Sequence, residues 1–289
     1  MASNVERKKQ ISPCSLSLND IEKLFKRLSI CVESAAKAEM AIHQKPKDID
    51  ADEHEKFLSH IKASHALSVV IRGRDGEVFV DHGNDNAFSS PNLPTRITNI
   101  YFDSRPAFKT RNNNRDPFNW LVINLDFTQP PLMDWSNPVS APTINASEVT
   151  VYGSDENWVA GVMDIVNRTV DQEVSSWRRF IHRSFIYDIG LLLFGAPLAF
   201  YLCYLASPLI QNSFLSRHSI LTGAGYIYSF FIGVMLYRIL FGYTRWAFPK
   251  VELIGHGGNA AKHRTLWGAL IFAILAGIVS TYLYENLKR

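Results

Sequence analysis

Three long apolar runs in the C-terminal part of the chain constrain its fold more than any other feature. They cover residues 189–205, 220–236 and 266–283, and none contains Asp, Glu, Lys or Arg. A helix needs about 17–25 mostly apolar residues to cross the roughly 30 Å of hydrocarbon in a bilayer. With their flanking residues, the runs predict an all-α bundle of three spans at about 185–208, 219–243 and 265–285. The alternative, three core helices of a soluble protein, rarely lacks polar residues over so many turns.

The charges of the 289-residue chain divide at the same place. Residues 1–184 carry 22 Lys and Arg against 24 Asp and Glu, whereas residues 185–289 carry eight against three. The first part is therefore not a uniformly basic surface of the kind that coats nucleic acid. The three cysteines, Cys14, Cys31 and Cys203, have no metal-ligand spacing and suit a reducing compartment. No metal or cofactor is expected.

Basic residues near the span ends predict the orientation in the membrane. Seven lie on one side and three on the other, which places the N-terminal part in the cytosol and predicts a multi-pass protein of the inner (cytoplasmic) membrane. The first ten residues lack the apolar core of a cleavable signal peptide, so we expect the first span to act as an internal anchor. The seven are Arg178, Arg179, Arg183, Arg245, Lys250, Lys262 and Arg264, and the three are Arg217, Lys288 and Arg289.

Residues 17–153 read as a cytosolic α+β domain that follows a flexible tail over residues 1–16. Ser17 and Asp20 resemble a helix cap, and apolar spacing predicts one helix up to Lys45-Pro46 and a second through residues 57–65. Arg74-Asp75-Gly76 has the composition of a hairpin turn. Short connections then predict an antiparallel sheet of about five strands with helices on one face. The strand signals cover residues 66–72, 77–81, 96–103, 119–127 and 148–152.

A connecting amphipathic helix is predicted over residues 154–184, starting at Ser154. Apart from Gly161 inside this helix, no Gly or Pro lies between Ser154 and Gly190. One interpretation is a continuous helix into the first span, a rigid shaft about 75 Å long that would transmit movement of the cytosolic domain. The other is that residues 177–183 (WRRFIHR) form a separate helix lying on the lipid headgroups.

The segment at residues 96–118 alternates basic and aromatic side chains. Such alternation suits phosphate contacts and base stacking, so it predicts a site for a nucleotide or a single-stranded oligonucleotide. The asparagines at residues 112–114 add groups that could read base edges. The competing interpretation is a solvated connection between two strands. The ligand-contact candidates are Arg96, Arg105, Phe108, Lys109, Arg111 and Arg115.

No catalytic arrangement with usable spacing is present in the sequence, so we expect the protein not to be an enzyme. His54, His60 and His65 lack the partners of a zinc site. The glycine-rich segment 255–258 lacks the Lys-Ser/Thr of a P-loop and reads as a membrane-surface loop.

Small residues repeat every four positions in two of the apolar runs, which lets membrane helices approach closely. Packing within one bundle would account for one stripe, and the second favours a homo-oligomer. Pro197 removes a backbone donor within the first run and is either a packing kink or a hinge for gating. Arg238 either snorkels to the headgroups or, in an oligomer, lines a ring that favours anions. The helix-packing candidates are Gly225, Ser229, Gly233, Ala269, Ala273 and Gly277.

This layout resembles the membrane effectors of bacterial anti-phage defence systems. In those proteins a cytosolic domain senses a nucleotide or oligonucleotide signal and transmembrane helices perturb the membrane. The resemblance is one of architecture and assigns no residue. It implies a ligand-controlled oligomeric ion pore, with the signal made by an enzyme encoded nearby. The alternative is a membrane-anchored adaptor that recruits a protein partner and conducts nothing.

Overall fold

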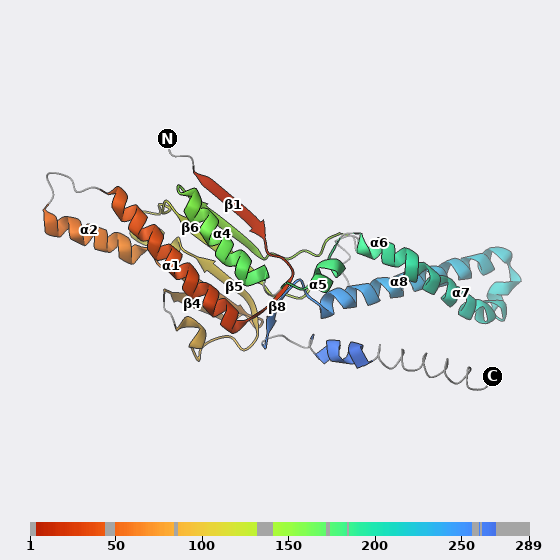
Figure 1. The fold of residues 1–289 in the computed structure, drawn as a ribbon. Helices are drawn as coiled ribbons and strands as arrows, with labels where there is room; N and C mark the ends of the chain where they lie inside the picture. The colour runs from red at the N-terminus through yellow and green to blue at the C-terminus, as the bar shows by residue number, and fades with distance from the viewer. Residues whose placement is uncertain are drawn as a thin grey trace, which may run out of the picture. The chain divides into compact units, whose positions relative to one another are not determined.

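The chain forms two compact units in the computed structural model (Figure 1). The first, which we call the head, contains Met1–Thr128, Asn145–Ser176 and Lys250–Gly258. The second, the hairpin unit, contains Gln129–Ile144, Trp177–Pro249 and Asn259–Arg289. The structure describes residues 4–43, 50–83, 86–131, 141–171, 174–183, 185–255, 260 and 262–269.

A six-stranded antiparallel sheet forms the centre of the head, with the strand order β1-β7-β6-β5-β3-β4. All five expected strands are present, and the hairpin turn between β3 and β4 has Gly76 at φ +85°, as its composition predicted. The strands are β1 (Val5–Gln10), β3 (Ser68–Gly73), β4 (Val78–His82), β5 (Ile97–Asp103), β6 (Trp120–Asp126) and β7 (Glu148–Gly153).

Helices α1 (Leu18–Ile42) and α4 (Glu156–Asp171) pack together on one face of this sheet (Figure 1). The predicted cap of α1 is a complete capping box between Ser17 and Asp20. Alternate residues of the strands point into the core under these helices, because successive side chains of a strand face opposite sides. Helix α2 (Ala51–Ser64) confirms the second predicted helix, and α3 (Pro106–Arg111) and the short η1 (Ala87–Ser89) lie in connections. Core residues include Phe25, Leu28, Ile71, Ile100, Phe102, Leu121, Ile123, Val149, Val151 and Val162.

The expected flexible tail over residues 1–16 is wrong, because β1 is the sixth strand of the sheet. It pairs with β7 from Val5 opposite Gly153 to Gln10 opposite Glu148. Its sequence, VERKKQ, has no apolar alternation, so hydropathy could not reveal it. Polar contacts hold its side chains instead: Arg7 to Glu156 at 2.9 Å and Lys9 to Asn167 at 2.6 Å.

A second, unexpected element is the parallel ladder of β2 (Cys14–Ser17) and β8 (Val251–Ile254). Val251 and Leu253 are buried in the core of the head, whereas the sequence suggested that this region led into a loop at the membrane surface. The chain therefore returns to the head after the second apolar run. In all, it passes between the two units five times.

The continuous shaft from residue 154 into the first span is not present. Helix α4 ends at Asp171, and Val174 forms a bridge with Cys14. The N–H of Ser175 donates to the carbonyl of Pro13 at 3.2 Å, so these residues use their backbone groups in contacts with the β2 region. A separate short helix, α5 (Ser176–Ile181), follows, which confirms the separate helix of the alternative interpretation but does not test its place on lipid headgroups.

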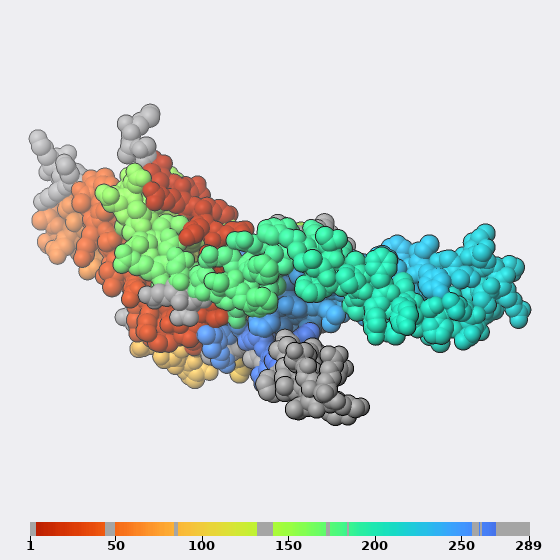
Figure 2. Space-filling view, turned by 45° about the vertical axis from the view of Figure 1, so that its right-hand side comes forward, coloured from red at the N-terminus to blue at the C-terminus, as the bar shows by residue number. Residues whose placement is uncertain are grey.

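The hairpin unit contains two helices long and apolar enough to cross a membrane, Ile186–Gln211 and Ser219–Ala247. They pack along each other, as the space-filling view shows for the green-to-cyan and blue segments (Figure 2). Residues 262–269 are mostly helical, but most of the third apolar run lies outside the described residues, so the three-span bundle is not confirmed. The first helix comprises α6 (Ile186–Gly190), η2 (Leu191–Gly195) and α7 (Ala196–Gln211); η3 (Phe214–Arg217) then leads to α8 (Ser219–Ala247).

Candidate functional site

The six residues predicted to contact a ligand do not form one cluster. Arg96 is exposed immediately before β5, whereas the other five follow β5, on or near α3. The seven residues of β5 separate its ends by about 20 Å. Arg96 therefore lies apart from the other candidates.

Arg105 lies on the sheet face opposite α1 and α4, which we call the open face. Its guanidinium binds Asp103 through two hydrogen bonds, Nε to Oδ1 at 2.9 Å and Nη2 to Oδ2 at 2.8 Å. These bonds raise the pKa of Arg105. Burial, followed by the charge of Asp103, raises the pKa of Tyr101, whose hydroxyl donates to the same carboxylate at 3.1 Å. The charge of Arg105 is thus balanced locally.

Two aromatic residues that the sequence reasoning missed extend this group across the open face. The Arg105 guanidinium carbon lies 4.6 Å from the ring centre of Trp120. Trp120 in turn stacks with Tyr152 at 5.3 Å and an interplanar angle of 16°. Both residues are cross-strand partners in the β6–β7 ladder. The period-two alternation of the strand that places Asn124 on the open face also places Trp120 there, so the signal was present.

The asparagine run after α3 forms a tight turn. Asn113 and Asn114 have φ of 51° and 61°, a left-handed conformation that Asn tolerates better than most residues. The Asn112 side chain donates to the carbonyl of Phe108 at 3.0 Å, which caps the helix. These contacts give the asparagine run a structural role at the end of α3. The turn also presents Arg115 to solvent.

The other cations near α3 have partners within the head. Lys109 pairs with Asp116 at 2.9 Å, and Arg111 donates to the carbonyl of Ala63 at 2.6 Å while remaining exposed. Arg111 and Arg115 are exposed and Lys109, on α3, is partly exposed, so a phosphate can reach these three cations.

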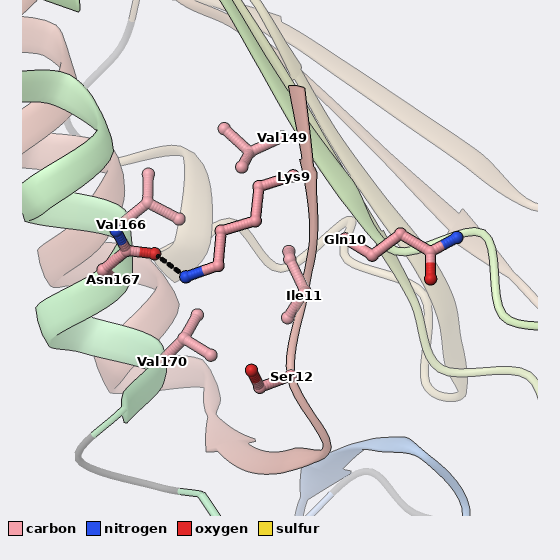
Figure 3. Close-up of a pocket in the computed structure, with 8 residues that line it drawn as sticks. All are labelled: Lys9, Gln10, Ile11, Ser12, Val149, Val166, Asn167 and Val170. Carbon is pink, nitrogen blue, oxygen red and sulfur yellow. Dashed lines mark hydrogen bonds between the residues drawn. The ribbon is translucent and has the colours of Figure 1, made fainter. Parts of the chain in front are cut away.

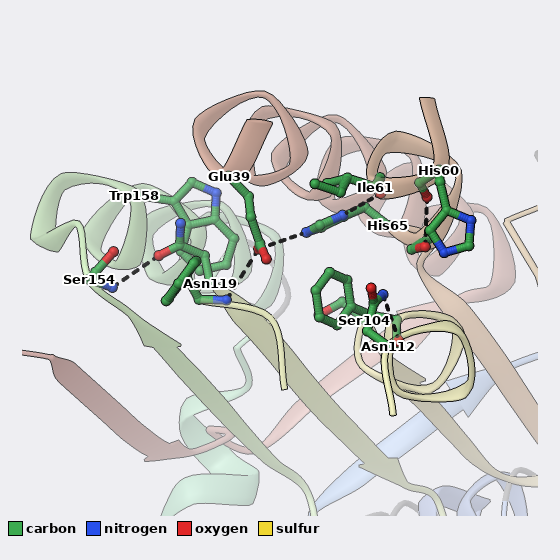
Figure 4. Close-up of polar contacts among 12 residues, drawn as sticks. Glu39, His60, Ile61, His65, Ser104, Asn112, Asn119, Ser154 and Trp158 are labelled. Atoms are coloured by element: carbon green, nitrogen blue, oxygen red, sulfur yellow. Dashed lines mark hydrogen bonds and ion pairs between the residues drawn. The ribbon is translucent and has the colours of Figure 1, made fainter. Parts of the chain in front are cut away.

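Phe108 does not fit a stacking role, because it is buried against the ring of His65 at 5.0 Å. The Nδ1 of His65 lies 2.9 Å from the carbonyl of Ile61, and its Nε2 lies 3.2 Å from a Glu39 carboxylate oxygen (Figure 4). Both ring nitrogens of the buried His65 therefore lie next to oxygen atoms of the protein. The backbone N–H of Phe118 also donates to Glu39, at 3.3 Å. This buried group joins α1, α2 and the segment after α3.

A cavity between β1 and α4 has a volume of about 10 Å³ (Figure 3). Lys9, Ile11, Val149, Asn167 and Val170 are among its lining residues. This volume suits at most a single water molecule. It is far too small for a nucleotide.

Close packing of α7 and α8 explains one of the two small-residue stripes. A Cβ atom at Gly233 would overlap the backbone of Ala199, and one at Gly225 would touch Ile210 at 3.4 Å. Ser229, between them, donates to the carbonyl of Gly225 at 2.9 Å. This stripe is used within the hairpin. Of the other stripe, Ala269 is helical, while Ala273 and Gly277 lie outside the described residues.

The backbone ladder is altered next to Pro197. Leu191–Gly195 forms a π-helical turn, in which the N–H of Ala196 donates to the carbonyl of Leu191. Pro197 follows at the start of α7, where its missing donor is tolerated. Turns of this kind in helices frequently mark functional positions.

Tyr237, which the sequence reasoning missed, fills the notch beside this turn. Cβ atoms at Gly190 and Gly195 would both collide with its ring or hydroxyl. The Tyr237 hydroxyl donates to the carbonyl of Tyr187 at 3.1 Å. The two glycines therefore matter because they accommodate this ring. Arg238, the next residue of α8, is partly buried.

Three buried basic side chains bind backbone carbonyls near the ends of α5 and α8, and we call them the Arg–His cluster. Arg178 donates to Pro249 at 3.1 Å, and His182 contacts Phe248 at 2.7 Å. Arg245 donates to the carbonyls of Ile181, Ala141 and Arg183 at 3.1–3.3 Å. His182 also contacts the Thr143 hydroxyl at 2.7 Å. Arg178 and Arg245, read from the sequence as markers of orientation, thus fasten three segments of the hairpin unit together.

The described residues contain no group of three or more His, Cys, Asp or Glu that could hold a metal ion. Comparisons of the chain with protein-family models, curated proteins and solved structures find no match.

Proposed function

We propose that this protein is a ligand-controlled membrane effector. Its head senses a nucleotide or short oligonucleotide from the cytosol, and its apolar helices permeabilise the inner membrane as a homo-oligomer. The outward surfaces of Ile186–Gln211 and Ser219–Ala247 support the membrane assignment. They expose Leu192, Phe194, Leu209, Ile220 and Tyr228 among other large side chains, a surface that requires lipid or another apolar partner.

The β2–β8 ladder is the observation that carries the membrane arrangement in this proposal. It joins residues that precede the first apolar helix to residues that follow the second, within one folded head. If the two helices cross the bilayer, the chain between Trp177 and Pro249 must enter and leave on the same side. This argument favours a two-crossing hairpin, with Arg217 at its far end and the basic residues on the cytosolic side.

The Arg–His cluster suggests how the head controls the hairpin. Ala141 and Thr143 belong to the connection between β6 and β7, and they contact Arg245 and His182 at the base of α8. A change at the ends of those two strands would be passed along this connection. A ligand can drive such a change only by binding the two arrangements with different affinity. Several chain connections replace the single rigid shaft that we expected.

The ligand surface that we propose lies around α3. Lys109, Arg111 and Arg115 supply cations for phosphate, and Trp120 and Tyr152 supply planar groups. Pro197 and its π-helical turn are the proposed hinge, and Arg238 the proposed permeation residue. The architectural resemblance suggests anti-phage defence as the setting, with a signal-synthesising enzyme encoded nearby.

Ion flux through reconstituted vesicles tests the proposal. The purified full chain is placed in liposomes, and free nucleotides and short single-stranded oligoribonucleotides are added on the head side. We expect flux with one class of ligand, loss of flux in an R111Q/R115Q double variant, and unchanged flux in R96Q, whose arginine lies at the other end of β5. Absence of flux with every ligand, or equal loss in R96Q, would contradict the proposal.

A second candidate function, a non-conducting membrane-anchored adaptor, is favoured by the open face of the sheet. On this face the charge of Arg105 is paired with Asp103, and that of Lys8 with Glu148. The adjoining edge strand β4 exposes Val78 and Val80, as protein interfaces often do. An adaptor keeps its function when unrelated transmembrane helices replace its own, whereas a pore loses it.

A further inference from the structure

The segment before the first apolar helix has one aromatic, strongly exposed side. Trp177, Phe180 and Phe185 are 56%, 48% and 49% exposed. The rings of Trp177 and Phe180 stack at 6.0 Å with an interplanar angle of 22°. Arg179 and Arg183 are exposed within the same segment. Large aromatic rings next to exposed arginines therefore characterise this surface.

The opposite side of the same segment is fixed to the hairpin unit. Arg178, Ile181 and His182 are buried, and Arg178 and His182 bind the carbonyls of Pro249 and Phe248. Since these contacts set the rotation of α5, Trp177 and Phe180 cannot turn inward without breaking them. The exposure of the outward side is therefore fixed by contacts within the fold.

Other amphipathic aromatic residues lie at the C-terminal end of α8, next to the carbonyls that Arg178 and His182 bind. Tyr243 stacks near Trp246 at 5.7 Å and contacts Trp267 at 5.7 Å. Trp177, Trp246 and Trp267 are all the tryptophans among the described residues of the hairpin unit. Trp and Tyr are enriched at the headgroup level of membranes. Their placement supports a position of this end of the hairpin at a lipid–water interface.

We propose that Trp177, Arg179, Phe180 and Arg183 form a binding surface for anionic phospholipid headgroups, an inference that rests on the proposed membrane placement. The rings occupy the boundary of the hydrocarbon, while the two guanidinium groups bind lipid phosphates. Lipid is the occupant because this surface leads directly into the apolar helix Ile186–Gln211, whose own surface is mostly exposed. Its positive charge complements an anionic leaflet.

The bound lipid also regulates the hairpin through α5. Lipid on the outer side holds α5 in place, and the inner side of α5 holds the last carbonyls after α8. Anionic lipid therefore stabilises the base of α8 in the arrangement described here. By linkage, any change of the head that releases α5 weakens lipid binding to the same extent.

Selectivity for spin-labelled lipid tests this inference in the inserted full chain. The protein is reconstituted in phosphatidylcholine, and the relative association of spin-labelled phosphatidylglycerol and phosphatidylcholine is measured. We expect a preference for phosphatidylglycerol of about fivefold for each contributing arginine. The preference should decrease at high salt and approach unity in R179Q/R183Q. The control R217Q removes an exposed arginine of η3, at the other end of the hairpin, and should keep the preference.

The outcomes separate the two claims. Equal insertion of all variants with no lipid preference in the wild-type chain, or a preference retained by R179Q/R183Q, overturns the lipid surface alone. Failure of the wild-type chain to float with any vesicle overturns the membrane placement, and the lipid surface with it.

Discussion

The backbone N–H of Cys14 donates a hydrogen bond to the carbonyl oxygen of Lys250 at 3.0 Å. The two residues flank the whole region of α5 to α8 in the sequence, and the pairing continues to Ser17 opposite Ile254. A short segment that follows a long apolar helix would ordinarily be read as a surface loop. Here it supplies core residues to the head, so both ends of the hairpin are fixed to the same domain.

Leu253→Ala should destabilise the head by about 2–5 kcal/mol, because it leaves a cavity in the core. Leu253 is 2% exposed, whereas its neighbour Ile254 is 52% exposed. Ile254→Ala is therefore a matched control and should change the free energy of unfolding by less than about 0.5 kcal/mol. Denaturant unfolding followed by tryptophan fluorescence measures both. Equal effects of the two substitutions would show that β8 does not contribute to the core.

Gly233→Leu should separate α7 from α8, because even a Cβ at this position overlaps Ala199. Gly223 lies on the same helix with open space around it, so Gly223→Leu should leave the hairpin intact. Spin labels placed at Leu205 and Tyr226 measure the spacing of the two helices, both with Gly233 in place and in the Gly233→Leu background. An unchanged distance would mean that the two helices are not closely packed through Gly233.

Glu39→Ala should cost the head about 3 kcal/mol, because it leaves the buried His65 ring without its carboxylate partner. Glu33 is exposed on the same helix, and Glu33→Ala serves as the control. Hydrogen exchange should show faster opening of α2 in Glu39→Ala, since His65 follows that helix directly. Exchange rates in α2 that match the wild type would contradict this role for Glu39.

The capping box predicts a loss of stability in acid. The hydrogen bond from the Ser17 side chain lowers the pKa of Asp20 in the folded state. Because the folded pKa is below the unfolded value of about 3.9, the contribution of Asp20 is complete above that value and is lost as pH falls through the folded pKa. Asp20→Asn should therefore flatten the decline of the denaturation midpoint below about pH 4. A variant that declines as steeply as the wild type would assign the acid sensitivity to other groups.

Much of the head could be predicted from local patterns. The elements that could not be predicted depend on partners far along the chain. The five expected strands alternate clearly, and Ser17 with Asp20 marked the start of α1. Strand β1 escaped because VERKKQ is charged and is held by Glu156 and Asn167, far along the chain. Strand β8 has only four residues, three of them apolar, so its hydropathy resembles that of the end of a span. Only the fold reveals its partner strand.

The candidate sites show the same limit. Arg96 and Arg105 are close in sequence, yet β5 places them at opposite ends of a strand. Arg105 lies over Trp120, and Trp120 stacks on Tyr152, only because three strands lie side by side. In the hairpin, a stripe of small residues indicated close packing at Gly233, but nothing in the spacing indicated that Tyr237 occupies the notch at Gly190 and Gly195.

Cysteine accessibility in intact cells tests the central claim, that the hairpin crosses the membrane while the head stays in the cytosol. In a chain whose native cysteines are replaced, Ser216→Cys lies at the exposed tip between α7 and α8, and Ser34→Cys lies on the exposed side of α1. A membrane-impermeant maleimide added outside should label Ser216→Cys directly, and Ser34→Cys only after the inner membrane is permeabilised. Labelling of both positions, or protection of both, in intact cells would contradict the account.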